Sequence, residues 1–264
     1  MKVSIVIPVF NQLEYTKLCI ESLEKNTADV EHEVIVVDNG STDGTEEYFK
    51  GKSVKYIRNR ENTGVAAAWN KGIRASEGGH ICLLNNDVVV SKGWLSALLE
   101  FYEKMPDAGI VSPGTRWGDM NYDFEKYAAV YVKKMRNVSI RWYSGWCMLI
   151  KRDRFDKAGF FGEEYKIGTY EDTDFYYSLN KAGFTSYVAG CSFIHHFGNR
   201  TLKVMRRETA GFEEENRRRM LKKWGLKPET YVQVKFKSLT KFMRNLYFKV
   251  FYGHTLDEKR RSAG

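Results

Sequence analysis

Four apolar runs, each followed by polar residues, alternate with helical patterns over the first 90 positions of this 264-residue chain. The runs are VSIVIPV (3–9), EVIVVD (33–38), VKYIR (54–58) and HICLL (80–84), and the first two are rich in β-branched residues. Near-continuous apolar runs are typical of strands that are buried on both faces of a parallel sheet. Their alternation with helical patterns predicts a doubly wound α/β fold.

The pattern changes after the fourth strand. GWLSALLEFYEKM (93–105) has a helical pattern, GIVSP (109–113) favours a short strand, and RWYSGWCMLI (141–150) is rich in aromatic residues and indicates some antiparallel strand. No linker rich in glycine, serine or proline separates the two stretches. We therefore expect residues 1–90 and 91–205 to form one domain whose sheet is mixed in its second half.

The composition limits the class of protein. Hydrophobic residues make up 43% of the chain, which is enough for a sizeable core. No stretch of roughly 18 to 20 residues is apolar throughout, as a membrane-spanning helix requires. The N-terminus MKVSIVIPVFNQ lacks a long apolar stretch and a cleavage site, so it favours a first strand over a signal peptide. The cysteines stand apart without a C-x-x-C pair, which favours free thiols in a reducing cytosol: Cys19, Cys82, Cys147 and Cys191.

Positive charge is concentrated at the C-terminal end. The net charge is +9, yet residues 203–264 alone contain 17 Lys and Arg against 7 Asp and Glu. The rest of the chain is therefore close to neutral, which argues against nucleic acid as a partner. We expect residues 206–264 to form a basic helical extension of the domain.

An amphipathic stripe runs through this extension. Apolar residues recur at spacings of three and four, and basic residues surround them: Phe236, Leu239, Met243, Leu246 and Val250, with Lys235, Lys237, Lys241, Arg244 and Lys249. One interpretation is that the stripe packs on the domain itself or on a dimer partner. The other is that residues 235–261 attach the protein peripherally to the anionic inner face of a membrane.

Polar residues directly follow the predicted strands, at the edge where open α/β sheets bind ligands. Asn11 is placed to cap a helix, and Glu14 would complete a capping box. The segment VDNGSTDGT (37–45) carries groups that can bind a nucleobase and a ribose, although its Asn-Gly and Asp-Gly pairs are also ordinary turn formers. These groups belong to Asp38, Asn39, Ser41, Thr42 and Asp43.

The segment NTGVAAAWN opens a predicted helix with small residues. They allow the helix N-terminus to approach a phosphate closely, or they serve close packing of the helix on the sheet. The polar and glycine positions are Asn62, Gly64 and Asn70.

The segment LLNNDVV contains a single acid, Asp87, after the fourth strand. The chain has no G-x-x-x-x-G-K-S/T loop and no G-x-G-x-x-G, so the common phosphate-binding loops are excluded. A diphosphate can instead be held through Mg²⁺ or Mn²⁺, which prefer oxygen ligands. Asp87 would then hold the cation while Asn85 and Asn86 orient a sugar or ribose. A plain β-turn is the alternative.

Acids and histidines recur in the second half. YEDTDF places Glu171, Asp172 and Asp174 at the start of a predicted helix, where acids are favoured by the helix dipole and also form general bases in pockets. His195 and His196 follow a short apolar run. Tandem histidines before a loop with glycine are candidates for binding metal or phosphate.

In order and spacing, the segments IVIPVFNQ, VDNGSTDGT, NTGVAAAWN, LLNND, YEDTDF and HHFGNRT resemble the family 2 glycosyltransferases of the GT-A fold. The resemblance implies a Rossmann-like nucleotide-sugar-binding half (1–90) merged with an acceptor and catalytic half (91–205). It also implies an inverting enzyme that uses Mn²⁺ or Mg²⁺ and a UDP- or dTDP-linked sugar. The acceptor would be a hydroxyl of a glycan, a glycolipid or a protein, and polysaccharide biosynthesis in the cytoplasm is the expected setting.

Roles for single residues follow from the same resemblance. Asp172 would be the catalytic base, Asp38 and Asn39 would bind the nucleotide, and Asp87 with His196 would hold the metal. His195 is the less favoured alternative ligand, and LLNND departs from the family's Asp-x-Asp motif at Asn85. Donor binding would extend to Pro8, Val9, Asn11, Asn62, Gly64, Asn70, Asn85 and Asn86, and the base would be supported by Glu171, Asp174 and Trp146.

Two other functions compete with this one. A sugar nucleotidyltransferase would need a basic, glycine-rich loop near its N-terminus, and PVFNQLEYT supplies neither feature. A non-catalytic nucleotide- or glycan-binding module would have no use for Asp87, Asp172 and His196 together.

Overall fold

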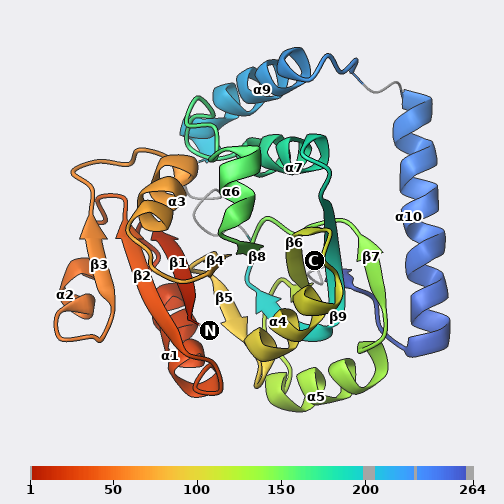
Figure 1. The fold of residues 1–264 in the computed structure, drawn as a ribbon, viewed down its shortest axis with the longest axis horizontal. Helices are drawn as coiled ribbons and strands as arrows, with labels where there is room; N and C mark the ends of the chain where they lie inside the picture. The colour runs from red at the N-terminus through yellow and green to blue at the C-terminus, as the bar shows by residue number, and fades with distance from the viewer. Residues whose placement is uncertain (1, 199–205, 229–230, 260–264) are drawn as a thin grey trace.

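The computed structural model describes residues 2–198, 206–228 and 231–259, and within them ten strands form one mixed sheet (Figure 1). The strand order is β3-β2-β1-β4-β8-β6-β9-β5, with β10 beside β6 and β7 beside β9. The strands are β1 (Val3–Val9), β2 (His32–Asp38), β3 (Lys55–Arg58), β4 (His80–Leu84), β5 (Val88–Val90), β6 (Ala108–Trp117), β7 (Ser139–Arg141), β8 (Cys147–Lys151), β9 (Thr185–His196) and β10 (Asp257–Lys259).

The two halves of the sheet differ in strand direction. β1 pairs in parallel with β2 and β4, and β2 pairs in parallel with β3. β8 runs antiparallel to both of its neighbours, β4 and β6, and β5 runs antiparallel to β9. This arrangement confirms the predicted α/β fold, with a parallel first half and a mixed second half.

Helices cover both faces of the sheet (Figure 1). Since strand side chains alternate between faces, Ile5 and Ile7 pack in one core cluster with residues of α1 and α4, whereas Val6 packs on the other face with α3. The helices are α1 (Leu13–Asn26), α2 (Thr45–Phe49), α3 (Val65–Arg74), α4 (Trp94–Lys104), α5 (Phe124–Met135), α6 (Asp153–Ala158), α7 (Glu171–Lys181), α9 (Arg206–Lys223) and α10 (Tyr231–Tyr252).

The capping box predicted at Asn11 and Glu14 is wrong. α1 begins at Leu13 after Gln12, which has a φ of 62° and makes no side-chain cap. Asp43, from the loop after β2, instead accepts a hydrogen bond from the Leu13 amide at 2.8 Å. The Asn11 side chain accepts one from the Thr42 amide, also at 2.8 Å, so Asn11 joins two loops rather than capping its own helix.

The C-terminal extension is helical, as predicted, and its two helices lie beside the domain (Figure 1). α9 is tied to α7, and α10 packs through Phe248 on a cluster that includes Tyr131 and Met135 of α5. The side chains of Lys235, Phe236 and Lys237 and the stretch 260–264 lie outside the described residues. No helix in the described ranges is both long and apolar enough to cross a membrane. The four cysteines are free.

Candidate active site

A cavity of about 420 Å³ lies where β1 and β4 end, which is the edge predicted to bind ligands. Its lining combines residues from both halves of the domain and one residue from α9: Pro8, Val9, Phe10, Asn39, Asn62, Val65, Trp69, Asn85, Asn86, Asp87, Gly145, Trp146, Ile167, Gly168, Thr169, Tyr170, Glu171, Asp172, Thr173 and Glu213. Six predicted site residues are outside this lining: Asn11, Asp38, Gly64, Asn70, Asp174 and His196.

Asp87 and His196 are neighbours because β5 and β9 pair. Residue 88 lies opposite His196 in that pairing, and Nε2 of His196 is 3.1 Å from Oδ1 of Asp87. Both side chains are buried. The Trp146 ring stacks on the imidazole with 5.0 Å between centroids, and its Nε1 donates a hydrogen bond to Oγ1 of Thr115 at 3.0 Å. Trp146 therefore sits between the cavity and the histidine and fixes the plane of its ring.

This pair fits a divalent cation that is shared with a substrate. Nδ1 of His196 has no hydrogen-bond partner among the described residues, and Nε2 faces the Asp87 carboxylate. A buried imidazole beside a carboxylate is suited to metal ligation. Within the ranges that the structure describes, no group of three or more His, Cys, Asp or Glu side chains could hold a metal ion by itself. Mg²⁺ is commonly held by one or two carboxylates together with substrate phosphates. The donor set thus suits an ion completed by a diphosphate.

His195 is engaged elsewhere. Its Nδ1 lies 2.9 Å from the Tyr122 hydroxyl and its Nε2 lies 3.0 Å from the carbonyl oxygen of Gly118. Burial lowers the pKa of His195 to about 4, so the ring is neutral near pH 7. Since both nitrogens already have partners, the geometry favours His196 as the ligand. The motif HHFGNRT continues into residues 199–201, which lie outside the described residues.

Glu171 and Asp172 form a pair of carboxyl groups at the first turn of α7, and both line the cavity. Burial, followed by the charge of Asp172, raises the pKa of Glu171 to about 8, and burial also raises the pKa of Asp172. Oε2 of Glu171 has no hydrogen-bond partner within the described ranges. Asp172 accepts a hydrogen bond from the Thr173 amide at 2.7 Å. Glu171 therefore holds a proton near pH 7.

Gly145 leaves room for Asp172. A Cβ added at Gly145 would lie 2.3 Å from Oδ2 of Asp172, well inside van der Waals contact. The glycine precedes β8 and lines the cavity beside Trp146. Its missing side chain allows the carboxylate to reach the cavity wall.

Asp174 has a different environment from its neighbours. It is buried outside the cavity lining, where Oδ2 accepts from Nζ of Lys223 and Oδ1 accepts from Nε1 of Trp224, both at 2.7 Å. Residues two apart on a helix differ by about 200° in direction, which is why Asp172 and Asp174 face different surroundings. Asp174 ties α9 to α7.

Asp38 is fully buried beneath the loop after β2. Oδ1 accepts hydrogen bonds from the amide and the hydroxyl of Ser41, at 2.9 and 2.6 Å. Oδ2 accepts from the Tyr56 hydroxyl at 2.5 Å and from Arg58 at 2.6 Å. These four donors hold the carboxylate inside the protein, so in this structure Asp38 shapes the loop and is not positioned to contact a nucleotide.

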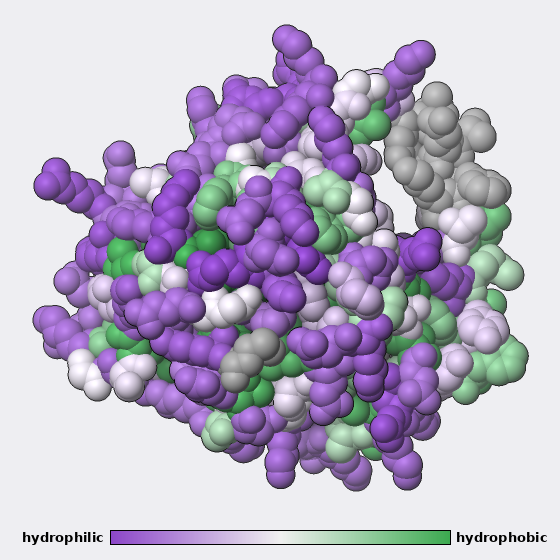
Figure 2. Space-filling model, in the orientation of Figure 1, coloured by the Kyte–Doolittle hydropathy of each residue, from purple (hydrophilic) through white to green (hydrophobic). Residues whose placement is uncertain are grey.

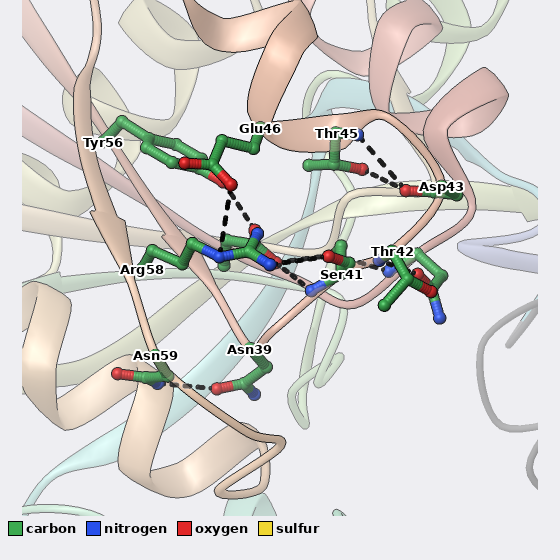
Figure 3. Close-up of polar contacts among 11 residues, drawn as sticks. Asn39, Ser41, Thr42, Asp43, Thr45, Glu46, Tyr56, Arg58 and Asn59 are labelled. Atoms are coloured by element: carbon green, nitrogen blue, oxygen red, sulfur yellow. Dashed lines mark hydrogen bonds and ion pairs between the residues drawn. The ribbon is translucent and has the colours of Figure 1, made fainter.

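Asn39, the next residue, does line the cavity. Its Oδ1 accepts from Asn59 at 2.8 Å (Figure 3), and its Nδ2 donates to the carbonyl of Gly64 at 3.2 Å. Gly64 has a φ of 87°, and the Asn62 side chain accepts from its amide at 3.0 Å. Asn70, by contrast, faces the loop before α7 and bonds both backbone groups of Phe161.

Part of the cavity lining was not predicted. Ile167, with a φ of 66°, and Tyr170, with a φ of 72°, belong to the loop before α7, and a positive φ at a β-branched residue is uncommon. Asn216 of α9 donates to the carbonyl of Lys166 at 3.1 Å and so holds this loop. Glu213, one helical turn earlier, completes the lining. No local sequence pattern marks these residues, because long-range packing brings them here.

Solved structures with a similar fold are glycosyltransferases. GalNAc-T7 with UDP, GalNAc and Mn²⁺ has a TM-score of 0.61 at 19% identity, over 74% of this chain and 44% of that one. Mannosyltransferase PcManGT from Pyrobaculum calidifontis, in complex with GDP-Man and Mn²⁺, has a TM-score of 0.58 at 17% identity, over 82% and 64%. At these identities the likeness concerns the fold alone, and this chain spans less than two thirds of each.

The sequence comparisons extend the likeness. An uncharacterized protein of Mycobacterium tuberculosis (strain ATCC 25618 / H37Rv) is 31% identical over 211 residues, which are 75% of this chain and 74% of the relative. Glycosyltransferase AglE of Haloferax volcanii is 36% identical over 99 residues, or 35% and 33% of the two chains. The model of glycosyl transferase family 2 matches residues 4–168. The protein is therefore a glycosyltransferase. It belongs to glycosyl transferase family 2.

Proposed function

We propose that this glycosyltransferase moves a sugar, with inversion, from a nucleoside-diphosphate sugar to a hydroxyl group of a glycan, a glycolipid or a protein-linked acceptor. The observation that supports the proposal is a single cavity with two chemically different ends. Asp172 stands at the α7 end, and Asp87 with its neighbour His196 stands at the β4–β5 end. Transfer between two oxygen atoms requires a base for the acceptor and positive charge for the leaving group, which a cation held at the second end would supply.

Asp172 acts as the base. Its carboxylate accepts the proton of the acceptor hydroxyl while the acceptor oxygen attacks the anomeric carbon, and the nucleoside diphosphate leaves from the opposite face. Since burial raises the pKa of Asp172, its carboxylate is a better proton acceptor than one in water. Glu171, with a pKa of about 8, stays protonated near pH 7 and does not compete for the proton.

The other end of the cavity holds the donor. Asp87 and His196 would hold Mn²⁺ or Mg²⁺, which supplies positive charge to the departing diphosphate when bound. Asn85 and Asn86 line the same end and would orient the sugar or ribose. Pro8, Val9, Asn39 and Asn62 would contact the nucleotide. UDP and dTDP were the expected carriers, and the GDP-Man in the PcManGT complex adds GDP to the nucleotides worth testing.

We further propose a cytoplasmic setting and a role in polysaccharide biosynthesis. Four free cysteines suit a reducing compartment. A glycolipid acceptor would place the reaction at a membrane surface.

Thermal unfolding with a panel of nucleotide sugars tests donor binding first. A ligand that binds the folded state raises the melting temperature by mass action. We expect one UDP-, dTDP- or GDP-sugar to do so in the presence of Mn²⁺, and to do so less in EDTA. Asp87→Ala should lose the Mn²⁺-dependent part of the shift. Asp29→Ala, which removes an exposed acid that bonds Ser96, should keep it.

Hydrolysis and transfer assays with the donor found in this way test the reaction. We expect turnover that stops in EDTA and returns with Mn²⁺ or Mg²⁺. Full activity in EDTA would refute the metal assignment. Binding of a nucleotide sugar without hydrolysis or transfer would favour the binding-module alternative, and release of pyrophosphate from a nucleoside triphosphate would favour the nucleotidyltransferase.

A further inference from the structure

α10 (Tyr231–Tyr252) has one side attached to the domain. Phe248 is buried and packs in the core cluster that contains α5, and Tyr252 packs beside it. Nζ of Lys241 pairs with Asp257 at 3.2 Å, and β10, which contains Asp257, pairs with β6 of the central sheet. The helix therefore has a fixed inner side.

The opposite side of α10 exposes large apolar residues. Seven of them form what we call the outer face, each between 45% and 69% exposed: Leu239, Phe242, Met243, Leu246, Tyr247, Val250 and Phe251. At about 100° per residue they cover an arc of roughly 180°, whose centre points away from Phe248. Figure 2 shows hydrophobic side chains along this outer edge of the molecule, where α10 lies in Figure 1.

Basic residues border the outer face. Viewed down the helix axis, Lys249 lies about 20° beyond Phe242 at one edge of the arc. Arg244 lies about 20° beyond Phe251 at the other edge, and both basic residues are exposed. The helix sequence contains five Lys and Arg residues and no Asp or Glu. An apolar arc with positively charged borders is the pattern of helices that lie in the plane of a membrane interface.

We propose that the outer face of α10 docks on an anionic lipid bilayer. The apolar side chains would enter the acyl boundary, while Arg244 and Lys249 meet lipid phosphates at the borders. A second copy of this chain fits less well, because pairing two such helices through the outer face brings like charges together with no acidic residue on either helix. Since the inner side is attached to the domain, docking would orient the cavity relative to the surface; the benefit to a lipid-linked acceptor rests on the proposed function.

Flotation with the full-length protein tests the proposal. Vesicles of phosphatidylcholine with 30% phosphatidylglycerol, about a third anionic lipid, are compared with phosphatidylcholine alone at low and high salt. We expect binding that needs the anionic lipid and weakens with salt. Arg244→Gln with Lys249→Gln should weaken it by about 30-fold, since each basic residue near the surface contributes about fivefold.

Two variants with the same change in net charge distinguish the contribution of the outer face to vesicle binding from that of the overall charge. Val250→Glu places a carboxylate on the outer face, and Ser238→Glu places one at an exposed position outside the arc. We expect Val250→Glu to lower vesicle binding by at least about tenfold and Ser238→Glu to change it little. Thermal unfolding and donor binding, which do not depend on the membrane, should be unchanged in both.

Three outcomes would overturn the proposal. The first is no binding to anionic vesicles at low salt. The second is equal binding by Val250→Glu and Ser238→Glu. The third is a wild-type dimer in light scattering that Val250→Glu converts to a monomer without loss of vesicle binding, which would assign the outer face to a second copy. Each of these outcomes would leave the test of nucleotide-sugar binding unaffected. The membrane proposal and the proposed function can therefore fail independently.

Discussion

Two regions of this molecule bury carboxyl groups in opposite ways. Below the loop after β2, Asp38 accepts hydrogen bonds from four donors, and one of them belongs to Arg58. At the start of α7, Glu171 has a carboxyl oxygen without a partner among the described residues, and the pKa of Glu171 and of Asp172 is raised by burial. A carboxylate with all its lone pairs satisfied stabilises local structure. A carboxyl pair that lines a cavity and has an oxygen without a partner is suited to exchange a proton.

Removing the proposed base should have the largest effect. We expect Asp172→Asn to lower the rate of transfer by at least about 100-fold, because an amide cannot accept the acceptor proton. Donor binding, measured by thermal shift, should change little. Asp174→Asn is the matched control, since Asp174 contacts Lys223 and Trp224 outside the cavity. Near-normal turnover in Asp172→Asn, or an equal loss in both variants, would exclude Asp172 as the base.

The contrast between Asp172 and Asp174 also marks how far the sequence could predict the site. Strand ends and the turns that follow them are local features, so Asn39 and the Asn85–Asp87 segment were predicted and do line the cavity. The different surroundings of Asp172 and Asp174 could not be predicted from the sequence of α7 alone, because the partners of Asp174 come from α9 and the residue after it. Glu213 and Ile167 reach the cavity through packing between distant segments, for which the chain carries no periodic signal.

Local rules also failed where a distant group took over a local role. Asn11 and Glu14 have the spacing of a capping box, yet Asp43 binds the first amide of α1. Asp38 has the position of a nucleotide ligand, yet Tyr56 and Arg58 of β3 enclose it. In each case the competing partner comes from another strand or loop, so only the tertiary structure decides which hydrogen bond forms.

Neutralising Asp38, whose carboxylate accepts four hydrogen bonds, should lower the stability of the protein. We expect Asp38→Asn to lower the free energy of unfolding by about 2 kcal/mol, because a buried amide cannot accept from all four donors and removes the charge that Arg58 contacts at 2.6 Å. The Arg58 side chain is 34% exposed, and water offsets part of the loss. Urea unfolding at pH 7 measures the change. Asp43→Asn, in the exposed part of the same loop, should cost less, and equal losses would contradict the special role of Asp38.

Neutralising Glu171, which has a carboxyl oxygen without a partner among the described residues, should instead raise the stability at pH 8. The folded-state pKa of Glu171 is about 8, above the usual value of 4.5. The stability linked to this group is therefore fully present below pH 4.5 and is lost as the pH rises toward 8, since the unfolded chain releases the proton first. Glu171→Gln cannot ionise in either state. We expect it to be more stable than wild type at pH 8 by at least about 1.4 kcal/mol, the free energy of a single pKa unit, and similar at pH 4.5.

Unfolding curves of wild type and Glu171→Gln between pH 4.5 and pH 8 give this difference directly. A constant offset between the two proteins would mean that Glu171 does not titrate abnormally. The comparison of the two regions would then rest on Asp172 alone.

The smallest predicted effect concerns the space beside Asp172. Gly145→Ala would place a Cβ 2.3 Å from Oδ2 of Asp172, so the carboxylate must turn away from the cavity wall. The obstructing atom is the end of a side chain, so we expect little change in stability. Transfer should fall by about threefold to tenfold, because displacing a base by a fraction of an ångström weakens its contact with the acceptor proton. Gly79→Ala, where an added Cβ meets nothing within 4 Å, is the matched control. If Gly145→Ala lost stability but kept its transfer rate per folded molecule, the glycine would serve packing of β8 rather than the reach of the base.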